Sequence, residues 1–129
     1  MRIEDYSWPI KEGHIPYAHQ KHTAQFAILN PRCYILNDMG TGKTLSALWA
    51  ADILLSAGKI DKVLVVCPLS TMISTWCKDI VFNLPHRKYI TVHGSKEFRR
   101  RALNTKSDFY IINHDGIKVM EDDIMAAKF

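Results

Sequence analysis

The stretch from Cys33 to Thr44, which reads CYILNDMGTGKT, decides the fold of this 129-residue chain. Its first part, Cys33 to Leu36, is an apolar run between a Pro-Arg turn and a glycine loop, which predicts a buried strand. Apolar residues then recur at helical spacing from Thr44 to Ala57, and Gly58 follows where a glycine commonly ends a helix. A strand, a glycine loop and a helix in this order are the setting of a phosphate-binding loop.

The loop itself carries residue types that suit a nucleotide. Gly40 and Gly42 let the backbone turn its N–H groups toward phosphates, and the start of the next helix favours negative charge. Lys43 offers a positive charge to the β- and γ-phosphates, and Thr44 offers a hydroxyl to Mg²⁺. The strict pattern has glycine where this chain has Asn37. The residues expected to hold the nucleotide are Met39, Gly40, Thr41, Gly42, Lys43 and Thr44.

Strand and helix patterns alternate along the rest of the chain, which predicts an α/β fold with a parallel sheet and right-handed crossovers. Val63 to Cys67 is apolar on both faces, as in a central strand. The other expected elements are a helix over Tyr17 to Leu29, a helix capped by Ser70 and reaching about Asn83, a strand over Tyr89 to Val92, a helix over Glu97 to Leu103 and a strand over Phe109 to Ile112. Residues 1–16 are expected to be an irregular lead-in to one domain over residues 17–129.

Composition narrows the class of protein. Hydrophobic residues make up 47% and charged residues 23%, the balance of a globular protein that does not need a membrane. The longest apolar stretch, Ala47 to Ala57, is too short to span a bilayer and carries Asp52. Cys33, Cys67 and Cys77 form no Cys-x-x-Cys pair, so a disulfide framework or a zinc ribbon is excluded. Free thiols suit a reducing compartment, so we expect the cytoplasm.

Positive charge is concentrated in one part of the chain. The net charge is +4, yet the stretch from His86 to Lys106 alone carries seven basic residues and one acid. This imbalance favours a polyanionic partner, and a solvated helix face is the alternative. The acidic run Glu121-Asp122-Asp123 follows no apolar strand, so we expect it in a solvated turn.

Several short segments follow one another in a set order. They are Pro16 to Gln20, Leu36 to Thr44, Val65 to Ser70, His93-Gly94 and Tyr110 to Asp115. Together they resemble motifs of the first lobe of Swi/Snf-like superfamily-two helicases, over nearly the whole chain. The resemblance implies an incomplete RecA-like lobe of an ATP-dependent helicase or DNA translocase. This chain departs from the family at three positions, Asn37, Thr41 and Asn113, where other residues are commoner.

The resemblance also implies roles for single residues. The amide of Gln20 matches the donor and acceptor of adenine, although a surface glutamine is the alternative. Lys43 and Thr44 would serve catalysis. Its spacing from Ser70, and not the resemblance, turns the ring of Trp76 inward, so we expect it in the core. The residues expected to contact phosphates of nucleic acid, with DNA as the expected kind, are Ser70, Thr71, Arg99, Arg100 and Asn113.

Part of the catalytic machinery of such a motor is not in this sequence. No Asp-Glu pair ends a strand, and no second lobe supplies arginines. We therefore expect the coding sequence to continue past Phe129 with an Asp-Glu strand and a second lobe, and little turnover without them. Two alternatives stay open. One is a small stand-alone P-loop ATPase or kinase that uses Asp115 for Mg²⁺, and the other is a non-catalytic nucleic-acid-binding fragment.

Overall fold

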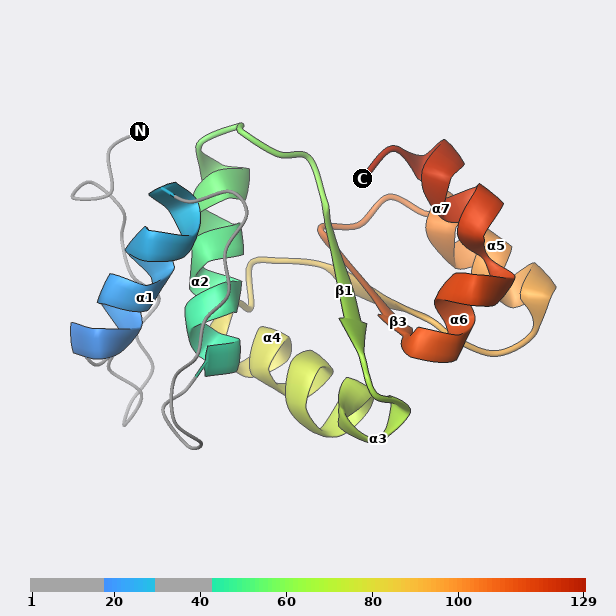
Figure 1. Cartoon of the computed structure of the whole chain (residues 1–129), viewed down its shortest axis with the longest axis horizontal. Coiled ribbons are helices and arrows are strands. Elements are labelled where there is room, and N and C mark those ends of the chain that lie inside the picture. Colours follow the sequence, from blue (N-terminus) through green and yellow to red (C-terminus); the bar gives the residue numbers. More distant parts are fainter. Residues whose placement is uncertain (1–17, 30–42) are drawn as a thin grey trace. The chain divides into compact units, whose positions relative to one another are not determined.

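The computed structural model describes residues 18–29 and 43–129, and the chain divides into two compact units, 1–60 and 61–129. In the first unit, helices α1 (Ala18–Leu29) and α2 (Lys43–Ser56) pack side by side (Figure 1). Both helices match the sequence pattern to within one residue at their ends. The predicted strand at Cys33 to Leu36 and the lead-in over residues 1–16 lie outside the described residues.

The end of α2 shows why the glycine after it is needed. Gly58 has a φ of 71°, in the left-handed region where a side chain is strained. This turn lets the N–H of Lys59 donate to the carbonyl of Leu54 at 3.0 Å, and that of Gly58 to the carbonyl of Leu55 at 3.2 Å. These bonds satisfy carbonyls that the helix leaves open, so the predicted helix end is confirmed.

The second unit is built on a parallel sheet of three strands. They are β1 (Val63–Cys67), β2 (Tyr89–Val92) and β3 (Phe109–Asn113), in the order β1-β3-β2. The parallel α/β class is therefore confirmed. Among the described strands the middle one is β3, all of whose residues are buried, and β1 pairs with it.

One helical stretch follows β1 directly. It consists of α3 (Leu69–Thr71), a π-helix (Met72–Cys77) and α4 (Lys78–Asn83). The prediction that Ser70 caps this stretch is wrong, because the chain enters the helix at Pro68, whose fixed φ already suits a helix start. Trp76, expected in the core, is only partly buried on the π-helix.

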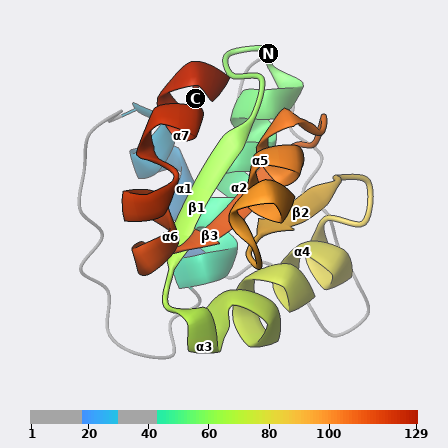
Figure 2. The ribbon, with the colours of Figure 1, turned by 90° about the vertical axis from the view of Figure 1, so that its right-hand side faces the viewer.

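Three further helices gather beside one face of the sheet (Figure 2). They are α5 (Lys96–Asn104), α6 (His114–Val119) and α7 (Glu121–Ala127). The cap of α5 is Ser95, whose Oγ accepts a hydrogen bond from the N–H of Phe98 at 3.1 Å. The acidic run at Glu121 is not a turn but the start of α7, where negative charge is favoured by the helix dipole.

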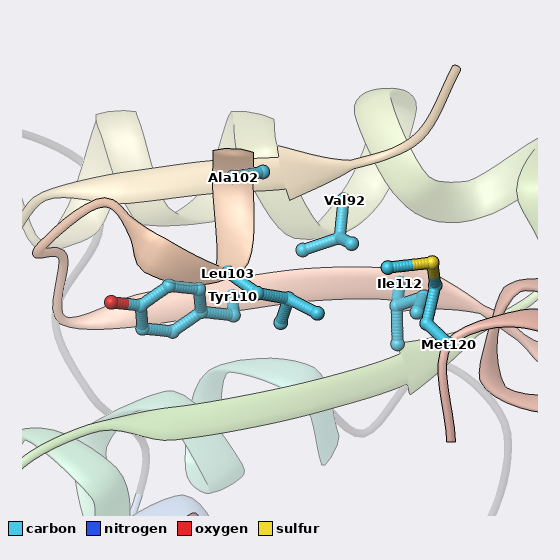
Figure 3. Packing of buried hydrophobic residues seen from close by; sticks show 6 residues of the cluster. All are labelled: Val92, Ala102, Leu103, Tyr110, Ile112 and Met120. Carbon is cyan, nitrogen blue, oxygen red and sulfur yellow. The ribbon is translucent and has the colours of Figure 1, made fainter. Parts of the chain in front are cut away.

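The core of the second unit lies between β3 and these helices, as Figure 3 shows. Met120 closes it from the junction of α6 and α7. The buried hydroxyl of Tyr110 donates to the carbonyl of Thr105 and accepts from the N–H of Ser107 at 3.0 Å. The core residues drawn there are Val92, Ala102, Leu103, Tyr110, Ile112 and Met120. Among the described helices, none has the length and apolar character needed to cross a bilayer.

Candidate nucleotide and nucleic-acid sites

Two of the expected nucleotide-binding residues lie at the start of α2. Lys43 is the first residue of this helix, and Thr44, next to it, is partly buried. The first turn of α2 carries no acidic residue that would compete for Lys43 or repel an anion. Met39, Gly40, Thr41 and Gly42 lie outside the described residues, so their expected role stays a prediction.

Gln20 lies in the first turn of α1 and is buried, with 4% of its surface exposed. The amino-terminal ends of α1 and α2 lie at the same end of this helix pair (Figure 1), so Gln20 and Lys43 belong to the same end. The alternative of a surface glutamine is therefore wrong. A buried amide is held by hydrogen bonds, which fixes the direction in which it points.

The two helices also bury polar residues that the sequence pattern did not single out. Thr23, Ser46 and Asp52 are each less than a tenth exposed. The one available signal was Asp52, which interrupts an apolar stretch, but a charge in such a stretch does not by itself indicate burial. A buried carboxylate requires partners, so this helix pair is more polar inside than its apolar content suggests.

The carboxyl edge of the sheet brings together several residues expected to contact nucleic acid. Cys67 and Asn113 are the last residues of β1 and β3 and stand opposite each other in the register. The chain continues from β1 directly into Ser70 and Thr71. In an open α/β sheet this edge is where ligands are usually bound. The structure thus brings three of the expected residues, Ser70, Thr71 and Asn113, to one edge.

These three residues differ in how accessible they are. Ser70 is exposed. The Thr71 hydroxyl donates to the carbonyl of Pro68 at 3.1 Å. Asn113 is 8% exposed, and its buried Oδ1 has no hydrogen-bond partner among the described residues. Ser70 therefore meets solvent directly, whereas Asn113 lies beneath the surface of this edge.

Gly116 is what allows Asn113 to lie so deep. A Cβ on Gly116 would come within 2.8 Å of both Asn113 Oδ1 and Ile112 Cγ1. Real Cβ atoms essentially never approach other atoms so closely, so one of these side chains would have to move. The absence of a side chain at Gly116 thus sets how α6 meets the end of β3.

The three consecutive arginines of α5 are in different environments. Arg100 Nε lies 3.3 Å from Asp123 Oδ1 of α7, and Arg101 lies 2.9 Å from Glu97 one helical turn away. Arg99 Nε is buried with no hydrogen-bond partner among the described residues. The positive charge of Arg100 is therefore partly balanced inside the unit, which the sequence alone did not show.

The thiols near this edge are not poised for chemistry. Burial raises the pKa of Cys67, and the hydrogen bond with Thr71 opposes this only in part. Burial also raises the pKa of Cys77, and Cys67 nearby raises it further. Both are therefore protonated at neutral pH and act as small apolar side chains.

The alternative site for Mg²⁺ at Asp115 is not supported by its position. Asp115 is exposed in the first turn of α6, after the end of β3 rather than on a strand. Within the described parts of the chain, no three His, Cys, Asp or Glu residues come together as a metal site.

Residues 19–129 match the family of the SNF2-related domain. This match covers far more than half of the chain. The chain belongs to the SNF2-related domain family. The resemblance found in the sequence to Swi/Snf-like proteins is therefore confirmed.

This SNF2-related chain spans only a small part of the length of two relatives that it matches. It is 34% identical over 71 residues to the human protein named DNA excision repair protein ERCC-6-like, covering 54% of this chain and 6% of that protein. Its fold matches the structure of the Sulfolobus solfataricus SWI2/SNF2 ATPase core in complex with dsDNA, with a TM-score of 0.70 and 20% identity. That match covers 84% of this chain and 23% of the archaeal one, and it confirms the RecA-like fold.

Proposed function

We propose that this chain is the ATP-binding part of a Swi/Snf-like superfamily-two motor. In the whole protein, ATP hydrolysis would be coupled to movement along DNA, in a helicase or a translocase. The observation that carries this proposal is the Gly-Thr-Gly-Lys-Thr sequence that leads into α2, within a chain of the SNF2-related family. We also propose that this motor is soluble and cytoplasmic and has no membrane partner.

In this function the first unit binds the nucleotide. Lys43 would pair with the terminal phosphates of ATP, and the hydroxyl of Thr44 would hold Mg²⁺. Bound Mg²⁺ would offset charge on the phosphates. The loop residues Met39 to Gly42 would supply backbone N–H groups, and Gln20 would select adenine through its amide.

The second unit would contact the DNA backbone at its carboxyl edge. Ser70 supports this because its hydroxyl is exposed beside a helix start. Thr71, Arg99 and Arg100 would add contacts to phosphates, without reading sequence. Asn113, being buried, would act by shaping this edge from below.

Turnover would depend on parts of the motor that this sequence does not contain. Phosphoryl transfer relies on positioning and on charges that surround the γ-phosphate. The proposal therefore includes a partner lobe carrying arginines and a strand that ends in Asp-Glu. The chain spans a small fraction of each relative, which agrees with such an arrangement.

Calorimetry with Mg-ATP tests the nucleotide site. Lys43→Ala should weaken ATP binding about tenfold or more, because it deletes a charge-assisted contact to phosphate. The matched control is Lys59→Ala, which removes an exposed lysine after the other end of α2 and should leave affinity unchanged. Equal ATP affinity in both variants would contradict the proposed site, and robust ATP hydrolysis by this chain would favour a stand-alone ATPase.

A further inference from the structure

A pocket opens at the amino edge of the sheet, opposite the edge assigned to DNA. Its volume is about 770 Å³, within the range of ligand sites. It is formed by the residues that lead into the three strands and by the last turn of α7, all within the second unit. None of the residues proposed to bind nucleotide or DNA lines this pocket.

Lysines dominate the charge of this pocket. Lys62, Lys88, Lys106 and Lys128 line it, against the carboxylates of Asp61 and Asp108. Asp108 is already engaged, because its Oδ2 accepts the backbone N–H of Lys88 at 2.9 Å and its Oδ1 lies 3.9 Å from Arg87. Among the described residues the four lysine ammonium groups have no ion pair, so the pocket presents a surplus of positive charge.

The pocket is also held in shape before any ligand arrives. The ammonium group of Lys62 lies 4.8 Å from the ring centre of Phe129 and 5.8 Å from that of Tyr110. The Tyr110 hydroxyl ties the segment from Thr105 to Ser107 to the end of the core. The rings of Tyr110 and Phe129 contact each other edge to face, with ring centres 5.1 Å apart, and together they help to position the ammonium group of Lys62.

The lining favours a peptide over a nucleic acid. A recess of this volume accepts a few side chains rather than a duplex. Asp61 lies among the lysines and would repel a continuous row of phosphates, whereas a peptide can place its acids away from it. Ala126 and Ala127 add apolar surface that a side chain can cover.

We propose that this pocket at the amino edge of the sheet binds an acidic peptide segment of a partner protein. The carboxylates of the peptide pair with Lys62, Lys88, Lys106 and Lys128, and an apolar side chain covers Ala126 and Ala127. The charge pattern sets specificity, because each lysine meets its own acid. Such binding leaves the opposite edge free for DNA.

Fluorescence anisotropy tests this with a short labelled peptide that alternates glutamate with leucine and serine. The double variant Lys88→Glu/Lys106→Glu should weaken its binding about tenfold or more, since two attractive pairs become repulsive. Lys78→Glu/Lys118→Glu is the matched control, because it changes the net charge equally at exposed lysines outside the pocket. The control should change affinity by less than about twofold.

Milder variants keep the test decisive if charge reversal harms folding. Lys88→Gln/Lys106→Gln should weaken binding about threefold by removing charge alone. A peptide with glutamine in place of each glutamate should not bind. Equal weakening in the control pair, equal binding of the glutamine peptide, or no binding of the acidic peptide would overturn the proposal. So would a matching loss of duplex DNA affinity in the pocket variant, which would make this edge a nucleic-acid surface.

Discussion

The two edges of the sheet in the second unit carry their charges differently. At the amino edge, lysines line a pocket and have no ion pairs among the described residues. On the side assigned to DNA, Arg100 and Arg101 are paired with acids, and the residues next to the strand ends are hydroxyls and an amide. The basic run that looks like one patch in the sequence is thus divided between two surfaces. Among the described residues, two of the three consecutive arginines of α5 are paired with acids, whereas the pocket lysines are not.

Both edges depend on the middle strand, so the largest effect is expected from its core. Ile112→Ala should lower the free energy of unfolding by about 2–5 kcal/mol, because Ile112 is fully buried between β3 and the helices. Chemical denaturation measures this. Ile73→Ala, at a position that is 65% exposed, should cost less than about 1 kcal/mol. Similar losses in the two variants would mean that the core between β3 and the helices does not hold the edges in place.

A smaller effect is expected at the carboxyl edge alone. Gly116→Ala should destabilise the chain by about 1–3 kcal/mol, since its Cβ would press on Asn113 and Ile112. Val119→Ala, half exposed on the same helix, serves as the comparison in the same denaturation experiment. If Gly116→Ala proves as stable as the parent chain, the close contact with Asn113 does not exist in solution.

The ion pair of Arg100 offers a test in which the affinity for DNA should rise. Asp123→Asn should raise affinity for duplex DNA about two- to threefold, because it frees Arg100 to meet a phosphate. The DNA affinity should also fall more steeply with rising salt, by the amount expected for about one additional phosphate contact. Asp122→Asn changes the net charge equally at an exposed neighbour of Asp123 that lacks the contact with Arg100. If both variants bind DNA equally well in titrations at several salt concentrations, the gain comes from net charge alone.

The smallest effect is a dependence on pH. The pKa values of Cys67 and Cys77 are raised in the folded chain, so folding favours the protonated thiols. Above about pH 8.5 the unfolded chain loses these protons first, and stability should fall as pH rises. In the variant Cys67→Ala/Cys77→Ala, the free energy of unfolding should fall less steeply as pH rises. An unchanged slope in denaturation curves from pH 8 to 10 would show that the thiols do not cause it.

Much of this architecture was predictable from local pattern. The strands Val63–Cys67 and Tyr89–Val92 match the predicted ranges because β-branched and apolar residues are bounded by polar or turn residues there. Ser70 was placed wrongly as a cap because Pro68 had already set the backbone for the helix. Helices α6 and α7 were missed because their short sequences show no helical periodicity strong enough to predict them.

The candidate site was predictable in residue type but not in accessibility. The start of α2 at Lys43 follows from the glycine loop before it. The burial of Gln20 and Asn113 does not follow from sequence, because it depends on which helix packs over each. The pairing of Arg100 joins residues 23 positions apart, and pattern along the chain cannot indicate such a contact.

The π-helix at Met72–Cys77 bears on how sequences of this family should be compared. Such a turn holds one residue more than an α-helical turn would, so it marks an insertion that the helix tolerated. A relative that lacks that residue would have a regular helix, and every later side chain would be turned by about 100°. Positions in α4, such as Ile80 and Asn83, would then change between buried and exposed from one lineage to another. We therefore expect alignments of this segment to need a one-residue gap inside a helix, where gaps are normally avoided.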